Sequence, residues 1–268
     1  MTPERLDSLS CVVAGSGPAV VLIHGTGLDA ESNWGPLIES LSGRFRVLAP
    51  NLPGAGGTPA PSAGLDLDDL AEQVIASVRA AVVVVGFCLV GHSLGAVVAA
   101  AVAAREPEQV RSLLLHAGWI TTGPREALMF DLWSRLLRAD PQLLARELVL
   151  QAMSPTLLQK ASAAELDELV GGFTAMLDMR IAGQIELDRR IDLAPALFNI
   201  QAATLVLASA EDRIIPPAQQ RALAEAIPAA RYREMPGGHG LPFENPTDFF
   251  STVTEWIEER QALTDAAA

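Results

Sequence analysis

Three side chains of the sequence have the types and the order of a nucleophile, an acid and a base. Ser93 lies in Gly91-His92-Ser93-Leu94-Gly95, which matches the G-x-S-x-G pattern of a tight turn that raises a serine hydroxyl above a sheet. Asp212 and His239 follow it in the chain. A serine activated by a histidine that a carboxylate orients performs nucleophilic acyl transfer. The sequence therefore predicts Ser93, Asp212 and His239 as catalytic residues.

These residue types also allow interpretations without catalysis. A serine in a turn or a histidine in a glycine loop is often only structural, and the G-x-S-x-G pattern also arises by chance. The agreement of several motifs in one order favours the functional interpretation. Glu211 is an alternative acid, but the shorter Asp212 loses less rotamer freedom when it is held on a loop.

A second motif predicts where an oxyanion could be stabilised. His24-Gly25-Thr26-Gly27 follows a strand that ends at Ile23, where a loop N–H can complete an oxyanion hole with the N–H that follows the nucleophile. We therefore predict that Thr26 and Leu94 donate from their main chains.

Short apolar runs, bounded by Gly, Pro or Asn, alternate with helical patterns along the first half of the chain. Such runs are typical of a parallel sheet covered on both faces. The predicted strands are 20–23, 46–49, 87–90, 112–115, 204–208 and 231–235. The predicted helices between them are 34–41, 67–80 and 94–104. The fold class is therefore α/β, with a mostly parallel, doubly wound sheet.

Strand signals vanish between residues 120 and 192, where apolar residues recur at helical spacing. We predict an inserted helical cap at 120–192 and a core domain formed by 1–119 and 193–268. Asp140-Pro141 and Asn245-Pro246 each place a capping oxygen before a proline, which predicts helix starts.

The substrate pocket is predicted to be apolar. Gly25, Trp119, Phe130 and Trp133 are its candidate lining residues. The cap's other Met and Phe side chains at helical spacing should mostly form the cap's own core, and some of them should face the site; they are Met129, Met153, Phe173 and Met176. His24 and His92 are expected to orient loops, and His116 to be a core histidine with a satisfied hydrogen bond.

The ordered motifs resemble those of the α/β-hydrolase superfamily over nearly the whole chain, most closely its capped esterases and enol-lactonase-like members. The resemblance implies the α/β-hydrolase fold and supports Asp212 as the acid. One departure is Asn51, where the loop after the strand commonly begins with Asp. This changes the electrostatics of the loop rather than the catalytic residues.

Composition excludes several classes of function. The 19 basic and 32 acidic residues give a net charge of −13, which repels nucleic-acid backbones and anionic lipids. The start, 1–10, lacks the apolar stretch of a signal peptide, and the longest apolar run, 80–90, is about half the roughly 20 residues that span a bilayer. We predict a cytoplasmic protein without a membrane segment or nucleic-acid partner. Its two cysteines have no metal or redox spacing, and we expect neither a metal nor a cofactor.

Together these features predict a serine hydrolase that cleaves an ester or lactone of a small, largely apolar acyl compound. The resemblance excludes the dehalogenase and epoxide-hydrolase branches, which use Asp at the position of Ser93. Thioester hydrolysis, C–C bond hydrolysis and a non-hydrolytic cyclase or lyase remain alternatives, as does a receptor that binds a small molecule without turnover. The sequence leaves the substrate open, and also the choice between a monomer and a homodimer.

Overall fold

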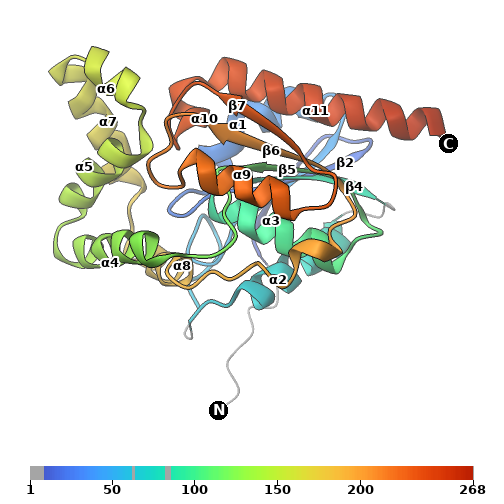
Figure 1. The fold of residues 1–268 in the computed structure, drawn as a ribbon, viewed down its shortest axis with the longest axis horizontal. Helices are drawn as coiled ribbons and strands as arrows, with labels where there is room; N and C mark the ends of the chain where they lie inside the picture. Colours follow the sequence, from blue (N-terminus) through green and yellow to red (C-terminus); the bar gives the residue numbers. More distant parts are fainter. Residues whose placement is uncertain (1–8, 62–63, 82–85, 268) are drawn as a thin grey trace.

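The computed structural model describes residues 9–61, 64–81 and 86–267. Within these residues a seven-stranded sheet runs through the centre of the molecule (Figure 1). The strands are β1 (Cys11–Ala14), β2 (Ala19–Ile23), β3 (Arg46–Pro50), β4 (Phe87–His92), β5 (Val110–His116), β6 (Ala203–Ser209) and β7 (Arg231–Met235). Most of the start at 1–10, and residues 82–85 of the apolar run, lie outside the described residues.

The strand order is β1-β3-β2-β4-β5-β6-β7. β1 pairs antiparallel with β3, and the other neighbouring pairs are parallel. β2 and β4 are buried at every position, because helices cover both faces of the sheet. The predicted fold class, a mostly parallel and doubly wound sheet, is confirmed.

The edge strand β1 was not among the predicted strands. It has only four residues, and the positions along it are half-buried or exposed. Such a short edge strand lacks the continuous apolar run that marks the central strands. The sequence pattern therefore does not predict its pairing with β3.

Two helices cover one face of the sheet and three cover the other, with a separate core on each face (Figure 1). The first layer holds α1 (Ala30–Ser42) and α11 (Pro246–Ala267), and the second holds α2 (Leu67–Ala81), α3 (Leu94–Arg105) and α9 (Pro217–Ala226). The short α10 (Leu241–Glu244) precedes α11. α3 is rich in alanine and almost entirely buried, which lets its axis approach the strands closely.

The chain between β5 and β6 is helical where the structure describes it. It forms α4 (Pro124–Ala139), α5 (Pro141–Ala152), α6 (Pro155–Lys160), α7 (Ala163–Met176), η1 (Met179–Ile181) and α8 (Ala182–Asp188), and η2 (Leu197–Asn199) then leads into β6. Helices α4 to α7 gather at one end of the molecule, at the left of Figure 1. A bridge between Thr121 and Asp192 joins the two ends of this segment.

The two predicted helix starts are confirmed. Asp140 accepts hydrogen bonds from the main-chain N–H groups of Gln142 and Leu143 at 2.9 and 3.2 Å. Asn245 accepts one from the N–H of Asp248 at 3.3 Å. These side chains satisfy N–H groups that a helix start leaves without partners.

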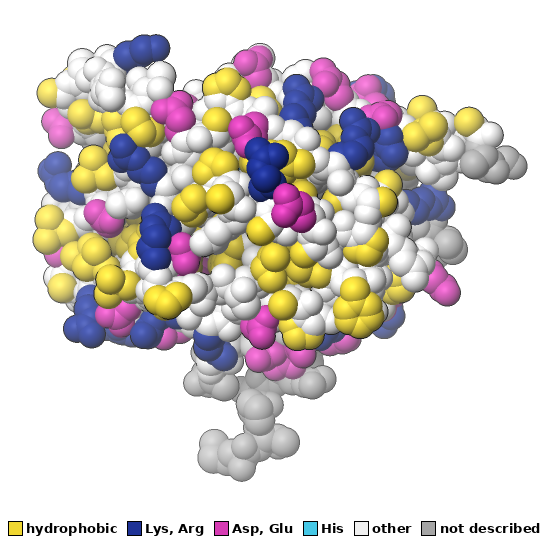
Figure 2. Space-filling model, in the orientation of Figure 1, with side chains coloured by type: hydrophobic (Ala, Val, Ile, Leu, Met, Phe, Trp, Pro, Cys, Tyr) yellow, Lys and Arg dark blue, Asp and Glu magenta, His cyan; other side chains and the backbone are white. Residues whose placement is uncertain are grey.

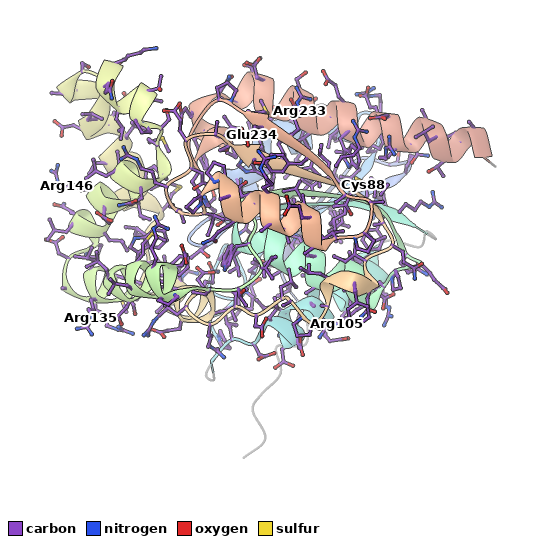
Figure 3. All side chains as sticks on the ribbon, in the orientation of Figure 1. Cys88, Arg105, Arg135, Arg146, Arg233 and Glu234 are labelled. Carbon is purple, nitrogen blue, oxygen red and sulfur yellow. The ribbon has the colours of Figure 1, made fainter. Side chains whose placement is uncertain are left out.

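Charged side chains of α4 and α5 point away from the body of the protein. Figure 3 shows Arg135 and Arg146 at the outer edge of these helices, and Arg135 pairs with Asp131 at 2.7 Å. Phe130 and Trp133 on the same α4 are buried. The inward side of this helix therefore carries Phe130, Trp133 and Leu137, whereas Leu128 and Leu132, which also stand at helical spacing, are exposed.

On the face seen in Figure 2, acidic and basic side chains are interspersed, and no broad basic area is visible. No histidine is visible there either, since all four histidines are buried. Among the residues that the structure describes, no helix is both long and apolar enough to cross a membrane.

Two glycines allow the turn between β4 and α3 to pack tightly. A Cβ at Gly91 would lie 2.2 Å from the carbonyl oxygen of Gly95, and a Cβ at Gly95 would lie 2.2 Å from that of Ile23. We expect Gly95→Ala to prevent folding or to lower the free energy of unfolding by more than about 4 kcal/mol. Urea denaturation followed by circular dichroism measures this.

The matched control is Gly171→Ala, in the middle of α7, where no atom would lie within 4 Å of the new Cβ. It should leave the protein folded and raise the free energy of unfolding by about 0.5–1 kcal/mol, because alanine favours a helix. Normal stability of Gly95→Ala would contradict the close packing of this turn.

Candidate active site

Ser93 is the one residue between β4 and α3. Its φ of 54° and ψ of −121° are unusual for a residue with a side chain and cost about 1–3 kcal/mol. Its N–H donates to the carbonyl of His116 on the neighbouring β5 at 2.9 Å. This anchored turn leaves the hydroxyl at the carboxyl ends of the parallel strands, where open α/β sheets build their sites.

The structure brings the three predicted catalytic side chains together. His239 Nε2 lies 2.9 Å from the Ser93 Oγ, and His239 Nδ1 lies 2.9 Å from the Asp212 Oδ2. Asp212 follows β6 and His239 follows β7, so adjacent parallel strands deliver both residues to the edge that carries Ser93. All three side chains are buried.

Asp212, rather than Glu211, contacts the histidine. Its Oδ1 accepts from the N–H groups of Ile214 and Ile215 at 2.9 and 2.8 Å, and its Oδ2 also accepts from Gln220 at 3.0 Å. These bonds fix the carboxylate against the imidazole. The Glu211 carboxylate instead accepts from the Thr156 hydroxyl at 2.7 Å, at the start of α6.

The two predicted oxyanion donors flank Ser93. A Cβ added to Gly25 would lie 3.2 Å from the Ser93 Cβ, so the loop after β2 runs directly against the serine. Thr26 follows Gly25, and Leu94 opens α3. Within the described ranges, neither the Thr26 nor the Leu94 N–H has a hydrogen-bond acceptor. Both are free to donate to an oxygen that gains charge beside Ser93.

His24 and Asn51 hold the loops around this turn. His24 Nδ1 donates to the Gly25 carbonyl at 2.8 Å, and its Nε2 accepts from the Leu52 N–H at 2.9 Å. Burial lowers the pKa of His24 to about 4, so it is neutral at pH 7. Asn51, the departure from the common Asp, accepts from the Ala30 N–H at 2.8 Å. A neutral amide therefore suffices for this contact.

His92 and His116 form a buried chain behind the serine. Their Nδ1 atoms lie 2.8 Å apart, and His116 Nε2 lies 2.9 Å from the Ser209 Oγ. Burial lowers the pKa of both rings well below the usual value, and each is neutral at pH 7. This chain links β4, β5 and β6 and keeps their ends in register beneath the site.

A small cavity of about 70 Å³ opens beside Ser93 and His239. Of the four predicted lining residues, Gly25, Phe130 and Trp133 line it. Trp119 does not: its ring packs 6.1 Å from that of Phe130, and its Nε1 donates to Thr122 at 3.0 Å. Trp119 therefore lies behind the wall that Phe130 forms, because the chain turns away after β5.

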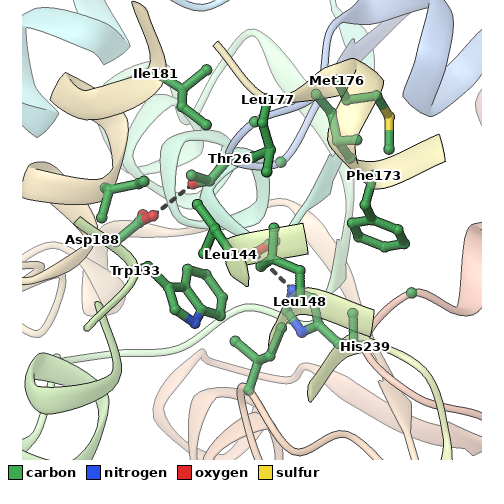
Figure 4. Close-up of a pocket in the computed structure, with 18 of the residues that line it drawn as sticks. Thr26, Trp133, Leu144, Leu148, Phe173, Met176, Leu177, Ile181, Asp188 and His239 are labelled. Carbon is green, nitrogen blue, oxygen red and sulfur yellow. Dashed lines mark hydrogen bonds between the residues drawn. The ribbon is translucent and has the colours of Figure 1, made fainter. Parts of the chain in front are cut away.

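Most of the lining comes from the helices between β5 and β6, as Figure 4 shows. Two of the cap's Met and Phe side chains, Phe173 and Met176, face the site, as expected for some of that group. The other apolar lining residues carry no individual signal in the sequence; they are Leu28, Leu144, Leu148, Ala152, Leu177, Ile181, Ile185, Ile214 and Phe243. Helical spacing marks those from the cap as inward-facing without indicating whether they meet a cavity or another helix, and Leu28, Ile214 and Phe243 come from outside the cap.

Asp188 is the unexpected member of this apolar lining. It ends α8, is only 1% exposed, and its Oδ2 accepts from the Thr26 hydroxyl at 2.6 Å. Burial raises the pKa of its carboxyl to about 8, and the hydrogen bond from Thr26 offsets part of this rise. In the sequence it stands among charged residues and is indistinguishable from a surface carboxylate.

The free energy of unfolding of Asp188→Asn, relative to that of the wild type, should increase as the pH rises. Between about pH 4 and 8 the unfolded chain releases the Asp188 proton while the folded chain keeps it, so the wild type loses about 1.4 kcal/mol of stability per pH unit. Asparagine has no proton to lose. The difference in the free energy of unfolding should grow by about 2–3 kcal/mol from pH 5 to pH 7.

Urea denaturation at pH 5, 6 and 7 measures this difference. Asp167→Asn, on an exposed position of α7, sets the baseline for removing one carboxylate from a helix. A difference for Asp188→Asn that does not change with pH would mean that the buried carboxyl is ionised in the folded protein.

The arrangement as a whole has the parts required for acyl transfer. The serine hydroxyl contacts a base, a carboxylate orients that base, and two main-chain N–H groups flank the serine. Among the described residues, no three His, Cys, Asp or Glu side chains gather as a metal-binding group.

Comparisons with known proteins show the family of the chain. Residues 20–252 match the alpha/beta hydrolase family. A pyrrolizixenacetamide deacetylase of Xenorhabdus hominickii is 35% identical over 251 residues, covering 93% of this chain and 94% of that protein. A pimeloyl-acyl-carrier-protein methyl ester esterase of Chromobacterium violaceum is 30% identical over 257 residues, covering 91% and 96%.

The fold recurs in solved structures. The enol-lactonase of Burkholderia xenovorans LB400 matches with a TM-score of 0.81 at 24% identity, over 93% of this chain and 96% of that one. The resemblance predicted from the motifs is thereby confirmed. Since the family match spans most of the sequence and the deacetylase is similar over nearly all of it, this chain belongs to the alpha/beta hydrolase family.

Proposed function

We propose that the protein is a serine hydrolase that cleaves an ester or lactone of a small, largely apolar acyl compound. The observation that carries the proposal is the pair of 2.9 Å contacts that link Ser93 to His239 and His239 to Asp212. The small size and apolar lining of the adjacent cavity support a small acyl group.

Each part of the site has a role in this reaction. Ser93 Oγ attacks the carbonyl carbon while His239 Nε2 takes the hydroxyl proton, and Asp212 stabilises the imidazolium that forms. The N–H groups of Thr26 and Leu94 bind the negative oxygen of the tetrahedral intermediate. His239 then gives the proton to the leaving oxygen, which leaves an acyl group on Ser93.

The second half of the reaction is deacylation, which regenerates the free serine. His239 takes a proton from a water molecule, whose oxygen attacks the acyl carbon, and the bond to Ser93 Oγ breaks as that oxygen regains the proton. For a lactone, the two halves open the ring to a hydroxy acid.

We also propose that residues 120–192 act as a cap that selects the substrate. Phe130 and Trp133 of α4, and Phe173 and Met176 of α7, supply much of the cavity wall. The remaining core supplies the reacting groups, so changes in the cap alter the acyl preference without touching them. A small-molecule substrate and a cytoplasmic location remain part of this proposal.

Removal of an acetyl group from an amide is a second candidate. It is supported by the 35% identity to a protein named as an acetamide deacetylase. The same tetrahedral intermediate and the same donors serve an amide, with His239 protonating a leaving nitrogen instead of an oxygen.

Labelling with a fluorophosphonate probe tests the proposed nucleophile. We expect one probe per chain, located on Ser93 by peptide mass spectrometry. Ser251→Ala, at an exposed position of α11, should label like the wild type. Absence of labelling on Ser93 would favour a receptor without turnover.

Measured rates on two sets of substrates distinguish the ester or lactone hydrolase from the deacetylase. Rates on p-nitrophenyl esters of two to twelve carbons should peak at short chains. A deacetylase should in addition cleave N-acetyl arylamides, which an esterase without amidase activity leaves intact. Inactivity on both sets, with Ser93 labelled, would contradict a simple esterase and the deacetylase, and would point to a specialised lactone, a thioester or a cyclisation substrate.

A further inference from the structure

The loop that carries the proposed base is short, and we call it the base loop. It joins β7 to α10, and His239 stands in it between Gly238 and Gly240. The contacts with Ser93 and Asp212 hold only the imidazole ring. The main chain of the loop needs contacts of its own if the ring is to stay aligned with the serine.

Glu244, the last residue of α10, supplies one of these contacts. Its Oε2 accepts from the Gly238 N–H at 3.0 Å, directly beside His239. The same Oε2 accepts from the Ser154 N–H at 3.0 Å, and the Oε1 accepts from the Ser154 hydroxyl. Three donors from two separate segments of the chain therefore converge on one carboxylate.

The second of these segments is the start of α6. Ser154 is fully buried and caps this helix, because its Oγ also accepts from the Leu157 N–H at 3.0 Å. A hydroxyl has one proton and two lone pairs, so Ser154 can accept from Leu157 and still donate to Glu244. The carboxylate thus joins the base loop to a helix of the segment between β5 and β6.

The base loop also packs directly on the end of α5. The Gly240 N–H donates to the Ala152 carbonyl at 2.8 Å. A Cβ on Gly238 would lie 2.4 Å from that same carbonyl oxygen. The main chain is therefore held on both sides of His239, at Gly240 by Ala152 and at Gly238 by Glu244.

Glu211 offers a direct contrast. Its carboxylate accepts from the N–H and the hydroxyl of Thr156, at 3.2 and 2.7 Å, two residues after Ser154. It therefore holds the same helix start, but in the described part of the chain its carboxylate donates no support to the base loop. Only the Glu244 carboxylate contacts both segments.

We propose that Glu244 is a positioning residue for His239: by holding the main chain at Gly238, it keeps the ring in line with the other two catalytic side chains. This rests on the proposed function, in which His239 is the base. Glu244 is absent from the described residues that line the cavity, so it acts through the loop rather than on the substrate. Without the carboxylate, two main-chain N–H groups lose their acceptor and the loop shifts. A shift of about 1 Å can lower the rate about a hundredfold.

The test compares three variants on the best p-nitrophenyl ester. Glu244→Met keeps the length of the side chain but removes the acceptor, and should lower kcat about ten- to a hundredfold. KM should stay within about threefold, because both halves of the reaction use the base. In Glu244→Gln the oxygen can take the place of Oε2 while the amide donates to Ser154, so kcat should stay within about threefold of the wild type. Glu211→Met, the matched control, should also stay within about threefold.

A spectroscopic measurement follows the ring itself. The proton that His239 Nδ1 donates to Asp212 gives a far-downfield resonance in the proton NMR spectrum, identified by its loss in His239→Gln. This resonance should shift or broaden in Glu244→Met and stay in place in Glu244→Gln and Glu211→Met. A residue that only stabilises the fold would leave it unchanged.

An unchanged kcat in folded Glu244→Met would overturn the inference, as would an equal loss in Glu211→Met. A rise in KM alone would also overturn it, because Glu244 would then act on binding. If Glu244→Met does not fold, Glu244→Asp replaces it; its carboxylate is retracted by one methylene group and should lower kcat at least about fivefold. If the wild type turns over no ester and Ser93 takes no probe, the proposed function fails, whereas the NMR comparison still decides whether Glu244 positions the ring.

Discussion

Ser93→Ala should abolish turnover of the proposed substrates and leave the fold intact. Loss of the nucleophile in a comparable triad lowers the rate by about 10⁶-fold, because no other group can form the acyl intermediate. Alanine keeps a Cβ in the same left-handed turn, and the N–H of residue 93 still donates to His116. Steady-state rates on the best ester, with circular dichroism as the check on folding, measure both expectations.

Two results would contradict this assignment. A Ser93→Ala variant that retained more than a few per cent of the wild-type rate would show that another group is the nucleophile. An equal loss in Ser251→Ala, whose side chain is exposed on α11, would show that the assay responds to general damage.

Asp212→Asn should lower kcat by about 10⁴-fold with little change in structure. The asparagine oxygen can take the place of Oδ1 and accept from Ile214 and Ile215. Its amide group then points at His239 and donates to Nδ1, which forces the proton onto Nε2. A His239 with hydrogen on Nε2 cannot accept the proton of Ser93, and the base is lost.

Glu211→Gln is the matched control, because it makes the same chemical change one residue earlier. Glu211 accepts from Thr156 rather than from a histidine, so we expect kcat within about threefold of the wild type. Comparison of kcat for the two variants decides which acid supports the base. A large loss in Glu211→Gln with a small one in Asp212→Asn would reverse the assignment.

The core of the fold could be predicted because its signals are local. Central strands such as 20–23 are continuous β-branched runs, and helix starts such as Asp140-Pro141 have their own capping chemistry. β1 was not predicted, because a four-residue edge strand depends on its pairing with β3 rather than on its own sequence pattern. The residues of β3 that pair with β1 lie 33 to 39 positions further along the chain (Ala14 with Val47 to Cys11 with Pro50).

That Ser93, Asp212 and His239 lie together could also be predicted, since each follows a strand whose end must lie at the same edge of the sheet. The residues that line the pocket were harder to predict. Trp119 also follows a strand, yet the chain turns and places it behind Phe130. Asp188 carries no local signal, because only the packing of α8 against the loop at Thr26 buries it. Side chains of a helical insertion acquire their surroundings from tertiary contacts that the spacing of residues does not encode.

At residue 93, the stability of the fold and the presence of the hydroxyl place opposite demands on the side chain. Its torsion angles are ones that glycine adopts freely, whereas any residue with a Cβ resists them. The only substitution that relaxes the main chain there therefore removes the hydroxyl. A gain in melting temperature at this position would therefore cost the hydroxyl, whereas at Gly171 an added methyl group lies far from any other atom and leaves Ser93 unchanged.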